Sequence, residues 1–71
     1  VLVEDGKNYL VMDTIIGNSI RYIYFVNEEN NSDFFIRKEI DRNEKKYLVN
    51  LDNEEEFKYA ANLFADKHKE N

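Results

Sequence analysis

The chain contains one histidine, His68, which lies between Lys67 and Lys69. An imidazole is the side chain best suited to act as a general base near neutral pH. Nucleophilic catalysis also needs a serine or cysteine beside it. The chain has no Cys, and Ser19 and Ser32 lie in predicted turns with no histidine near them in the sequence. We therefore expect His68 to be a solvated residue at a helix end, with no catalytic residue and no enzyme activity.

The glutamates Glu54, Glu55 and Glu56 form the densest acidic run. Consecutive residues of a helix point about 100° apart, so the three carboxylates cannot converge on one cation. The segment 41–43 begins like a calcium loop, but it lacks the glycine and the final glutamate that such a loop needs. With no Cys and a single His, a zinc site is also excluded. The sequence predicts no metal and no cofactor.

Tyr22 and Tyr24, next to Arg21, have the types and spacing of a base-stacking platform on a sheet. The charge of the chain argues against this use, because 15 Asp and Glu outnumber 10 Lys and Arg, for a net charge of -5. Phosphate contacts need a cationic surface, and so does binding to an anionic membrane. We expect no direct contact with nucleic acid or membrane.

A length of 71 residues predicts a single domain, residues 1–71, with a small core. The hydrophobic content is 42%, which is too high for a disordered segment. No apolar run reaches the roughly 18–20 residues of a membrane span. No basic segment followed by an apolar run opens the chain, and Cys is absent, so we expect a cytoplasmic protein.

Turn-forming residues divide the first fifty residues into strands, and Asp5-Gly6 is the strongest hairpin signal. The other predicted turns are 17–19, 27–33 and 41–45. The five predicted strands are 1–3, 8–16, 20–26, 34–40 and 46–51. Within the fourth, Phe34, Ile36 and Ile40 alternate with charged residues, and Phe35 breaks this alternation.

A helix is predicted to begin near Asp52, which has capping-box spacing to Glu55. The first turn is acidic and the far end is basic, as the helix dipole favours. An apolar stripe of Phe57, Ala60, Ala61 and Phe64, widened by Leu63, follows helical spacing. The predicted fold class is α+β: an antiparallel meander of about five strands with one C-terminal helix packed on one face.

The third predicted strand is apolar on both sides. Ile20, Tyr22, Tyr24 and Val26 point one way, and Ile23 and Phe25 point the other. One helix covers only one face of a sheet. Either the sheet curls until its second face is shielded, or that face contacts another chain.

The order of these features resembles the small acidic bacterial proteins of the YrzB-like family, a domain of unknown function. The similar segments are 5–9, 21–26, 34–37 and 51–64, which include Asp5-Gly6-Lys7-Asn8-Tyr9 and Asp52-Asn53-Glu54-Glu55-Glu56-Phe57. Phe57 departs from the family, which usually has another aromatic there, often Trp. The resemblance implies a cytoplasmic α+β protein with no assigned activity, and it brings no site residues.

Two hypotheses for function follow. The first is a non-catalytic protein–protein interaction module, with Tyr22 and Tyr24 as anchors on the uncovered face and a second copy or an unidentified protein as partner. The second is an acidic mimic of nucleic acid that binds a nucleic-acid-processing protein through Glu28, Glu29, Glu54 and Glu55. Its support is the charge distribution: -4 over residues 1–36, +2 over 37–46 and -3 over 47–71.

Overall fold

Three tight turns set the spacing of the strands. Asp5-Gly6, Asn18-Ser19 and Asn43-Glu44 each place two successive residues at positive φ, between 51° and 72°. Two-residue turns of this kind match the right-handed twist of antiparallel strands, and they favour Asn, Asp and Gly. The predicted turns at 5–6, 17–19 and 41–45 are therefore confirmed, with the last one reduced to its two central residues.

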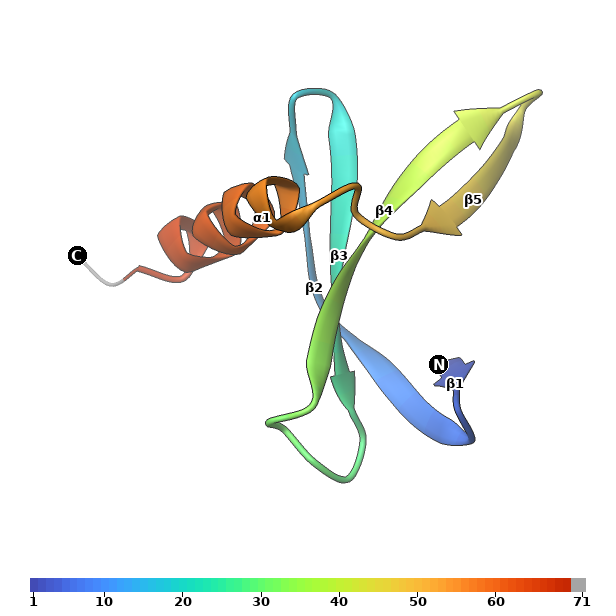
Figure 1. Cartoon of the computed structure of the whole chain (residues 1–71), viewed down its shortest axis with the longest axis vertical. Coiled ribbons are helices and arrows are strands. Elements are labelled where there is room, and N and C mark those ends of the chain that lie inside the picture. The colour runs from blue at the N-terminus through green and yellow to red at the C-terminus, as the bar shows by residue number, and fades with distance from the viewer. Residues whose placement is uncertain (70–71) are drawn as a thin grey trace.

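The computed structural model describes residues 1–69, which form five strands and one helix (Figure 1). The elements are β1 (Leu2–Glu4), β2 (Lys7–Gly17), β3 (Ile20–Asn27), β4 (Phe34–Arg42), β5 (Lys45–Val49) and α1 (Glu54–Lys67). The strands pair antiparallel in chain order, β1-β2-β3-β4-β5. The predicted α+β meander with one C-terminal helix is confirmed.

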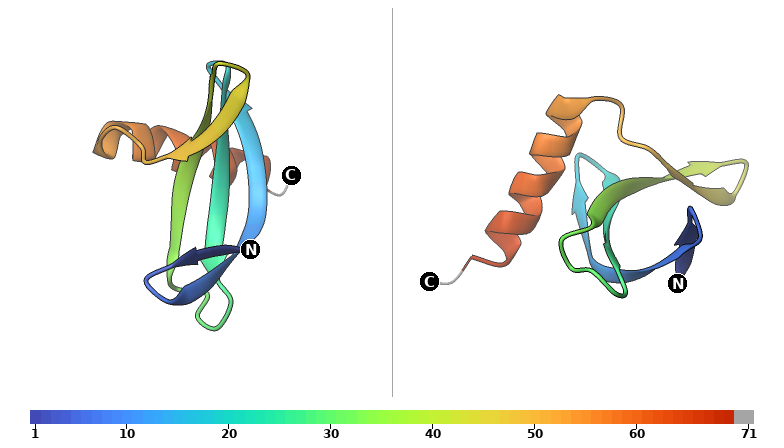
Figure 2. Two further views of the ribbon diagram at one scale, coloured as in Figure 1. Left: turned by 90° about the vertical axis from the view of Figure 1, so that its right-hand side faces the viewer. Right: turned by 60° about the horizontal axis from the view of Figure 1, so that its bottom comes forward.

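The sheet curls strongly, and a bulge in β2 contributes to the bend. The register with β3 shifts between Val11 and Asp13, so that Met12 is an extra residue. The curl brings β1 across the concave face of the sheet, as the two views of Figure 2 show. Tyr9, Ile23 and Phe25 are buried there. Of the two alternatives for the second face of β3, the structure shows the curled sheet.

A charged contact between strands that are not neighbours stabilises the curl. Arg37 Nη2 in β4 donates to both carboxylate oxygens of Glu4 in β1, at 2.9 Å each. The Arg37 guanidinium also lies 4.2 Å from the centre of the Phe35 ring, where a cation–π attraction operates. Phe35, which broke the predicted alternation, packs with Tyr9 and Phe25 inside the curl.

The helix covers the convex face, over the second half of β2, the first half of β3 and the middle of β4. Ala60 and Phe64 of α1 are buried against Tyr22 and Ile36. Gly17 lies directly beneath α1, where an added Cβ would come within 2.5 Å of Leu63 Cδ1. Phe57, which the helical stripe placed in the core, is instead 39% exposed.

The helix begins one residue later than the capping pattern predicts. Asn53, not Asp52, is the N-cap, and its side-chain oxygen accepts from Glu56 N at 2.9 Å. Glu56 reaches back and accepts from Asp52 N at 2.6 Å. The capping pair is therefore Asn53 with Glu56, and the prediction of Asp52 with Glu55 was wrong. The reason is tertiary, because Glu56 must also reach Lys38.

A buried ion pair joins the start of α1 to the sheet. Lys38 is only 9% exposed, and its Nζ donates to both oxygens of Glu56 at 3.1 Å. Asp52 lies 3.2 Å from the same Nζ, and the Tyr22 hydroxyl donates to Glu56 at 3.0 Å. Burial of two charges is costly unless every polar atom is satisfied, which is the case here.

The ion pair and the tyrosine beside it have shifted pKa values. Burial raises the pKa of the Glu56 carboxyl, but hydrogen bonds from Asp52 N, Lys38 and Tyr22 outweigh it, and the pKa lies below its ordinary 4.5. Burial lowers the pKa of Lys38, but Glu56 and Asp52 outweigh this effect and the pKa is raised. Burial and the contact with Glu56 raise the pKa of Tyr22 to about 12.

We predict that Glu56→Ala lowers the free energy of unfolding by about 3 kcal/mol, because Lys38 then remains buried without its main partner and the cap is lost. Urea denaturation followed by circular dichroism measures this change. Glu55→Ala is the matched control: it removes the neighbouring, exposed glutamate and should stay within about 0.5 kcal/mol of the wild type. Equal effects of the two substitutions would contradict the role of the ion pair.

Candidate functional site

The two tyrosines predicted as partner contacts lie on the face that α1 covers. Tyr22 is 2% exposed and belongs to the core, so its assignment as a surface anchor was wrong. The prediction assumed that the helix packs on the Ile23 and Phe25 face, but the curled sheet itself covers that face. Tyr24 is only partly buried, so part of its ring remains at the surface.

An open apolar groove lies beside the helix where Tyr24 reaches the surface. Its volume is about 310 Å³, and it runs along the C-terminal half of α1, where the helix meets β3 and β4. Its lining residues are Tyr24, Phe34, Ile36, Ala61, Phe64, Ala65 and His68. Phe34 is 44% exposed and stacks on the Tyr24 ring, with 5.3 Å between centroids. Phe64 meets the same ring edge-on at 5.6 Å.

The groove continues into an apolar row across three strands. Leu10 of β2 pairs with Val26 of β3, which in turn pairs with Phe34 of β4. Paired residues share a face of the sheet, so this row lies on the convex side. Val26 itself is only 7% exposed, so Leu10 and Phe34 are its surface members. Leu10 is 40% exposed. We call the groove and this row together the Phe34 surface.

Phe34 was predicted from the sequence as a strand residue and not as a site residue. The pair Phe34-Phe35 did indicate an exposed aromatic ring. Neighbouring residues of a strand point to opposite faces of the sheet, and one helix covers only one of these faces. Phe35 is taken up by the curl. Phe34 lies on the helix side, but beside the helix and not beneath it, and this placement depends on where α1 docks.

An ionic contact fixes the C-terminal end of the helix at the rim of the groove. Asp13 of β2 lies 2.7 Å from Lys67 Nζ and 2.6 Å from His68 Nε2. Lys67 also donates to the Thr14 carbonyl at 2.8 Å. His68 was expected to be a solvated residue at a helix end; its side chain is 66% exposed, and the structure adds the contact with Asp13.

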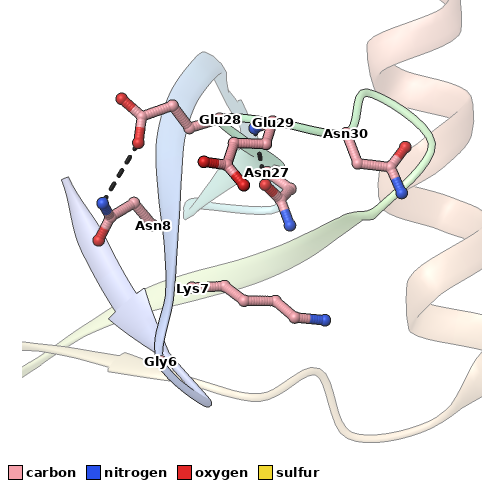
Figure 3. Close-up of a pocket in the computed structure, with 7 residues that line it drawn as sticks. All are labelled: Gly6, Lys7, Asn8, Asn27, Glu28, Glu29 and Asn30. Carbon is pink, nitrogen blue, oxygen red and sulfur yellow. Dashed lines mark hydrogen bonds between the residues drawn. The ribbon is translucent and has the colours of Figure 1, made fainter.

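The acidic candidates lie in two separate places. Glu28 and Glu29 follow β3 and line an open hollow of about 380 Å³ (Figure 3). Asn8 Nδ2 donates to Glu28 at 3.2 Å, and Asn27 Oδ1 accepts from Glu29 N at 2.8 Å. Glu54 and Glu55 are exposed at the start of α1. That end of the helix is held near the beginning of β3, so the length of β3, roughly 20 Å, separates the two clusters.

The described residues offer few side chains for metal binding or nucleophilic catalysis. Residues 1–69 contain no cluster of three or more His, Cys, Asp or Glu side chains that could hold a metal ion. In the same residues, no helix has the length and apolar character needed to cross a membrane. Ser19 lies in the β2–β3 turn and Ser32 in the β3–β4 loop, whereas His68 contacts Asp13 at the end of α1.

No family model, curated protein or solved structure matches this chain. The resemblance to the YrzB-like family therefore stays a prediction.

We predict that Asp13 makes stability depend on pH in the acid range. The hydrogen bond from Lys67 holds the pKa of Asp13 below its ordinary 3.8, although partial burial opposes this shift. A carboxyl with a depressed folded pKa stabilises the protein above its unfolded pKa, and this contribution is lost as the pH falls through the folded pKa. The stability difference between the wild type and Asp13→Asn should therefore be largest near neutral pH and shrink progressively as the pH falls past 3.8 toward the lower folded pKa.

Urea midpoints measured over this pH range test the prediction. Asp66→Asn is the control, since it removes an exposed carboxylate from the same end of the helix and should show no comparable loss of the difference with pH. A difference between wild type and Asp13→Asn that stays constant from neutral pH to about pH 3 would contradict the assignment.

Proposed function

We propose that this protein is a non-catalytic interaction module that binds a partner protein through the Phe34 surface. The observation that supports it is that Phe34 remains 44% exposed while its ring stacks on Tyr24. An ordered, exposed aromatic ring beside an apolar groove offers a partner a large contact at low cost in side-chain entropy. Large aromatic side chains are enriched among the residues that contribute most to binding.

The exposed apolar residues of the Phe34 surface adjoin one another, and this supports a binding role. Single exposed apolar residues are ordinary, but adjoining ones on one face mark an interaction site. Leu10, Phe34 and the groove adjoin one another through the strand register and the stacked ring. Burial of apolar surface contributes roughly 25 cal/mol per Å², so coverage of this surface is a substantial driving force for association.

The arrangement of polar groups favours binding over catalysis. His68 lies at the rim of the groove, but its Nε2 contacts Asp13 Oδ2 at 2.6 Å and is therefore already engaged. No serine lines the groove, and the polar groups among its lining side chains are the His68 imidazole and the Tyr24 hydroxyl. A reaction needs a convergent pair of catalytic groups together with a site for the reacting atom. The groove offers an apolar floor instead.

We predict that Phe34→Ser abolishes partner binding and leaves the fold intact, because the lost contacts lie at the surface. The matched control is Phe57→Ser, which removes a phenylalanine of similar exposure, 39%, on α1 outside the groove. Quantitative capture from an extract of the source cells should retain a protein with the wild type and with Phe57→Ser, but not with Phe34→Ser. Equal retention by all three would contradict the proposal.

Light scattering is the first measurement to make, since it separates the two kinds of partner. A mass near twice 8.5 kDa that Phe34→Ser reduces to the monomer identifies a second copy as the partner. A monomer at all concentrations directs the search to another protein. A dimer that persists in Phe34→Ser would place the contact elsewhere on the molecule.

The acidic mimic stays a prediction without a geometric argument of its own. Glu28 and Glu29 lie at one end of β3, while Glu54 and Glu55 lie near the other. The positive segment 37–46 forms most of β4 and its turn into β5, so it interrupts the acidic surface. A binding constant that falls steeply with salt, with competition by DNA or RNA, would support this alternative instead.

A further inference from the structure

The last strand of the sheet has an unpaired outer edge. β5 pairs only with β4, in a register that runs from Arg42 opposite Lys45 to Lys38 opposite Val49. The pair that closes a two-residue turn exchanges both backbone hydrogen bonds, and beyond it bonded and non-bonded pairs alternate. Lys46 and Leu48 therefore direct their N–H and C=O groups away from β4. Among residues 1–69, no backbone hydrogen bond outside the sheet reaches them.

The side chains along this edge offer both apolar and cationic contacts. Tyr47 is 47% exposed and Leu48 is 44% exposed. An open hollow of about 380 Å³ lies against the strand, lined by Ile40, Arg42, Asn43, Tyr47, Leu48 and Val49. A strand added at an edge gains affinity from main-chain hydrogen bonds and specificity from such hollows, which take alternate side chains.

Charge indicates what kind of strand fits. Residues 39–46 hold three cations and three anions, and the two further cations of residues 37–46, Arg37 and Lys38, pair with Glu4 and Glu56 away from this edge. Along β5 itself there are two lysines and no acid. Within residues 1–69, neither Lys45 nor Arg42 makes an ion pair. Opposite charges that face each other across paired strands stabilise the pairing, and like charges oppose it.

We propose that the outer edge of β5 binds an extended acidic segment of another protein, which adds to the sheet as a sixth strand. Its carboxylates would face Lys45 and Arg42 on the side of the sheet that carries Tyr47 and the hollow, and its alternate apolar side chains would lie against Leu48 on the opposite side. This edge is distinct from the Phe34 surface, and the two proposals stand independently. Nucleic acid does not fit, because the chain as a whole is acidic.

A second copy of the chain fits this edge less well than an acidic segment does. If β5 paired with itself about a two-fold axis at Tyr47, Lys45 and Lys46 would lie opposite Val49 and Leu48 of the second copy, with no acid on either strand to pair with them. Lysines on an edge strand oppose pairing between identical chains. The same lysines favour a partner of opposite charge.

The probe for the test is a capped peptide of about eight residues in which glutamate and valine alternate, with a lysine–valine peptide of equal length as its counterpart. Each is added to the full, nitrogen-15-labelled chain while its amide resonances are recorded. We expect the acidic peptide to shift the amides of Lys46 and Leu48, with a dissociation constant between about 1 μM and 1 mM that rises with salt. The basic peptide should leave them in place.

Leu48→Pro removes one outward N–H without removing a hydrogen bond to β4, and proline is tolerated at such an edge position. We expect this substitution to weaken the acidic peptide about tenfold or more. Val3→Pro is the matched control. Val3 likewise directs its N–H outward from an edge strand, β1, because it lies one position before the pair that closes its turn, so the change should leave binding unaltered. Lys45→Glu should weaken the acidic peptide about two- to fivefold.

Three results would overturn the proposal. They are no amide shift at about 1 mM acidic peptide, equal binding by the wild type and Leu48→Pro, and a dimer that Leu48→Pro converts to a monomer, which would assign the edge to a second copy. Phe34→Ser should bind the peptide as the wild type does. Loss of partner binding in that variant with peptide binding intact, or the reverse, shows which of the two proposals fails.

Discussion

The ion pair between Lys38 and Glu56 is the constraint on which the rest of the structure depends. It is the contact at which a charged residue of β4 meets the first turn of α1, and both side chains are largely removed from water. Breaking a buried pair costs far more than an exposed one, because the remaining charge is left without compensation. The docking point of the helix is therefore fixed at Tyr22 and Lys38, in the middle of the sheet.

Two consequences follow from that docking point. The helix has 14 residues and spans about 21 Å, so once its start is fixed over Tyr22 and its end over Asp13, it cannot also cover Leu10 and Phe34. The concave face of β3 receives no helix at all, and Ile23 and Phe25 must be buried by the sheet itself. The β2 bulge, the short strand β1 and the contact between Arg37 and Glu4 accomplish this.

The sequence predicts local structure well, since its signals act over short distances. Asp5-Gly6 adopts the turn that its residue types favour, and the helix begins within two residues of the predicted Asp52. Which face the helix covers was not predictable. β3 is apolar on both sides, so its alternation does not distinguish them. The choice depends on Lys38 and Glu56, whose pairing joins positions 18 residues apart, and on Asp13, which contacts His68 from 55 residues away.

The same limit explains the error at Tyr22 and the omission of Phe34. Tyrosine is a common interface residue, so residue type alone favours Tyr22 over a phenylalanine within an alternating strand. Burial reverses that order, because Tyr22 lies beneath the helix and Phe34 lies beside it. A chain of 71 residues has too few elements to cover both faces and both edges of a five-stranded sheet. The helix and the curl leave the Phe34 surface and the β5 edge open, and these are the two places at which we propose contacts with other molecules.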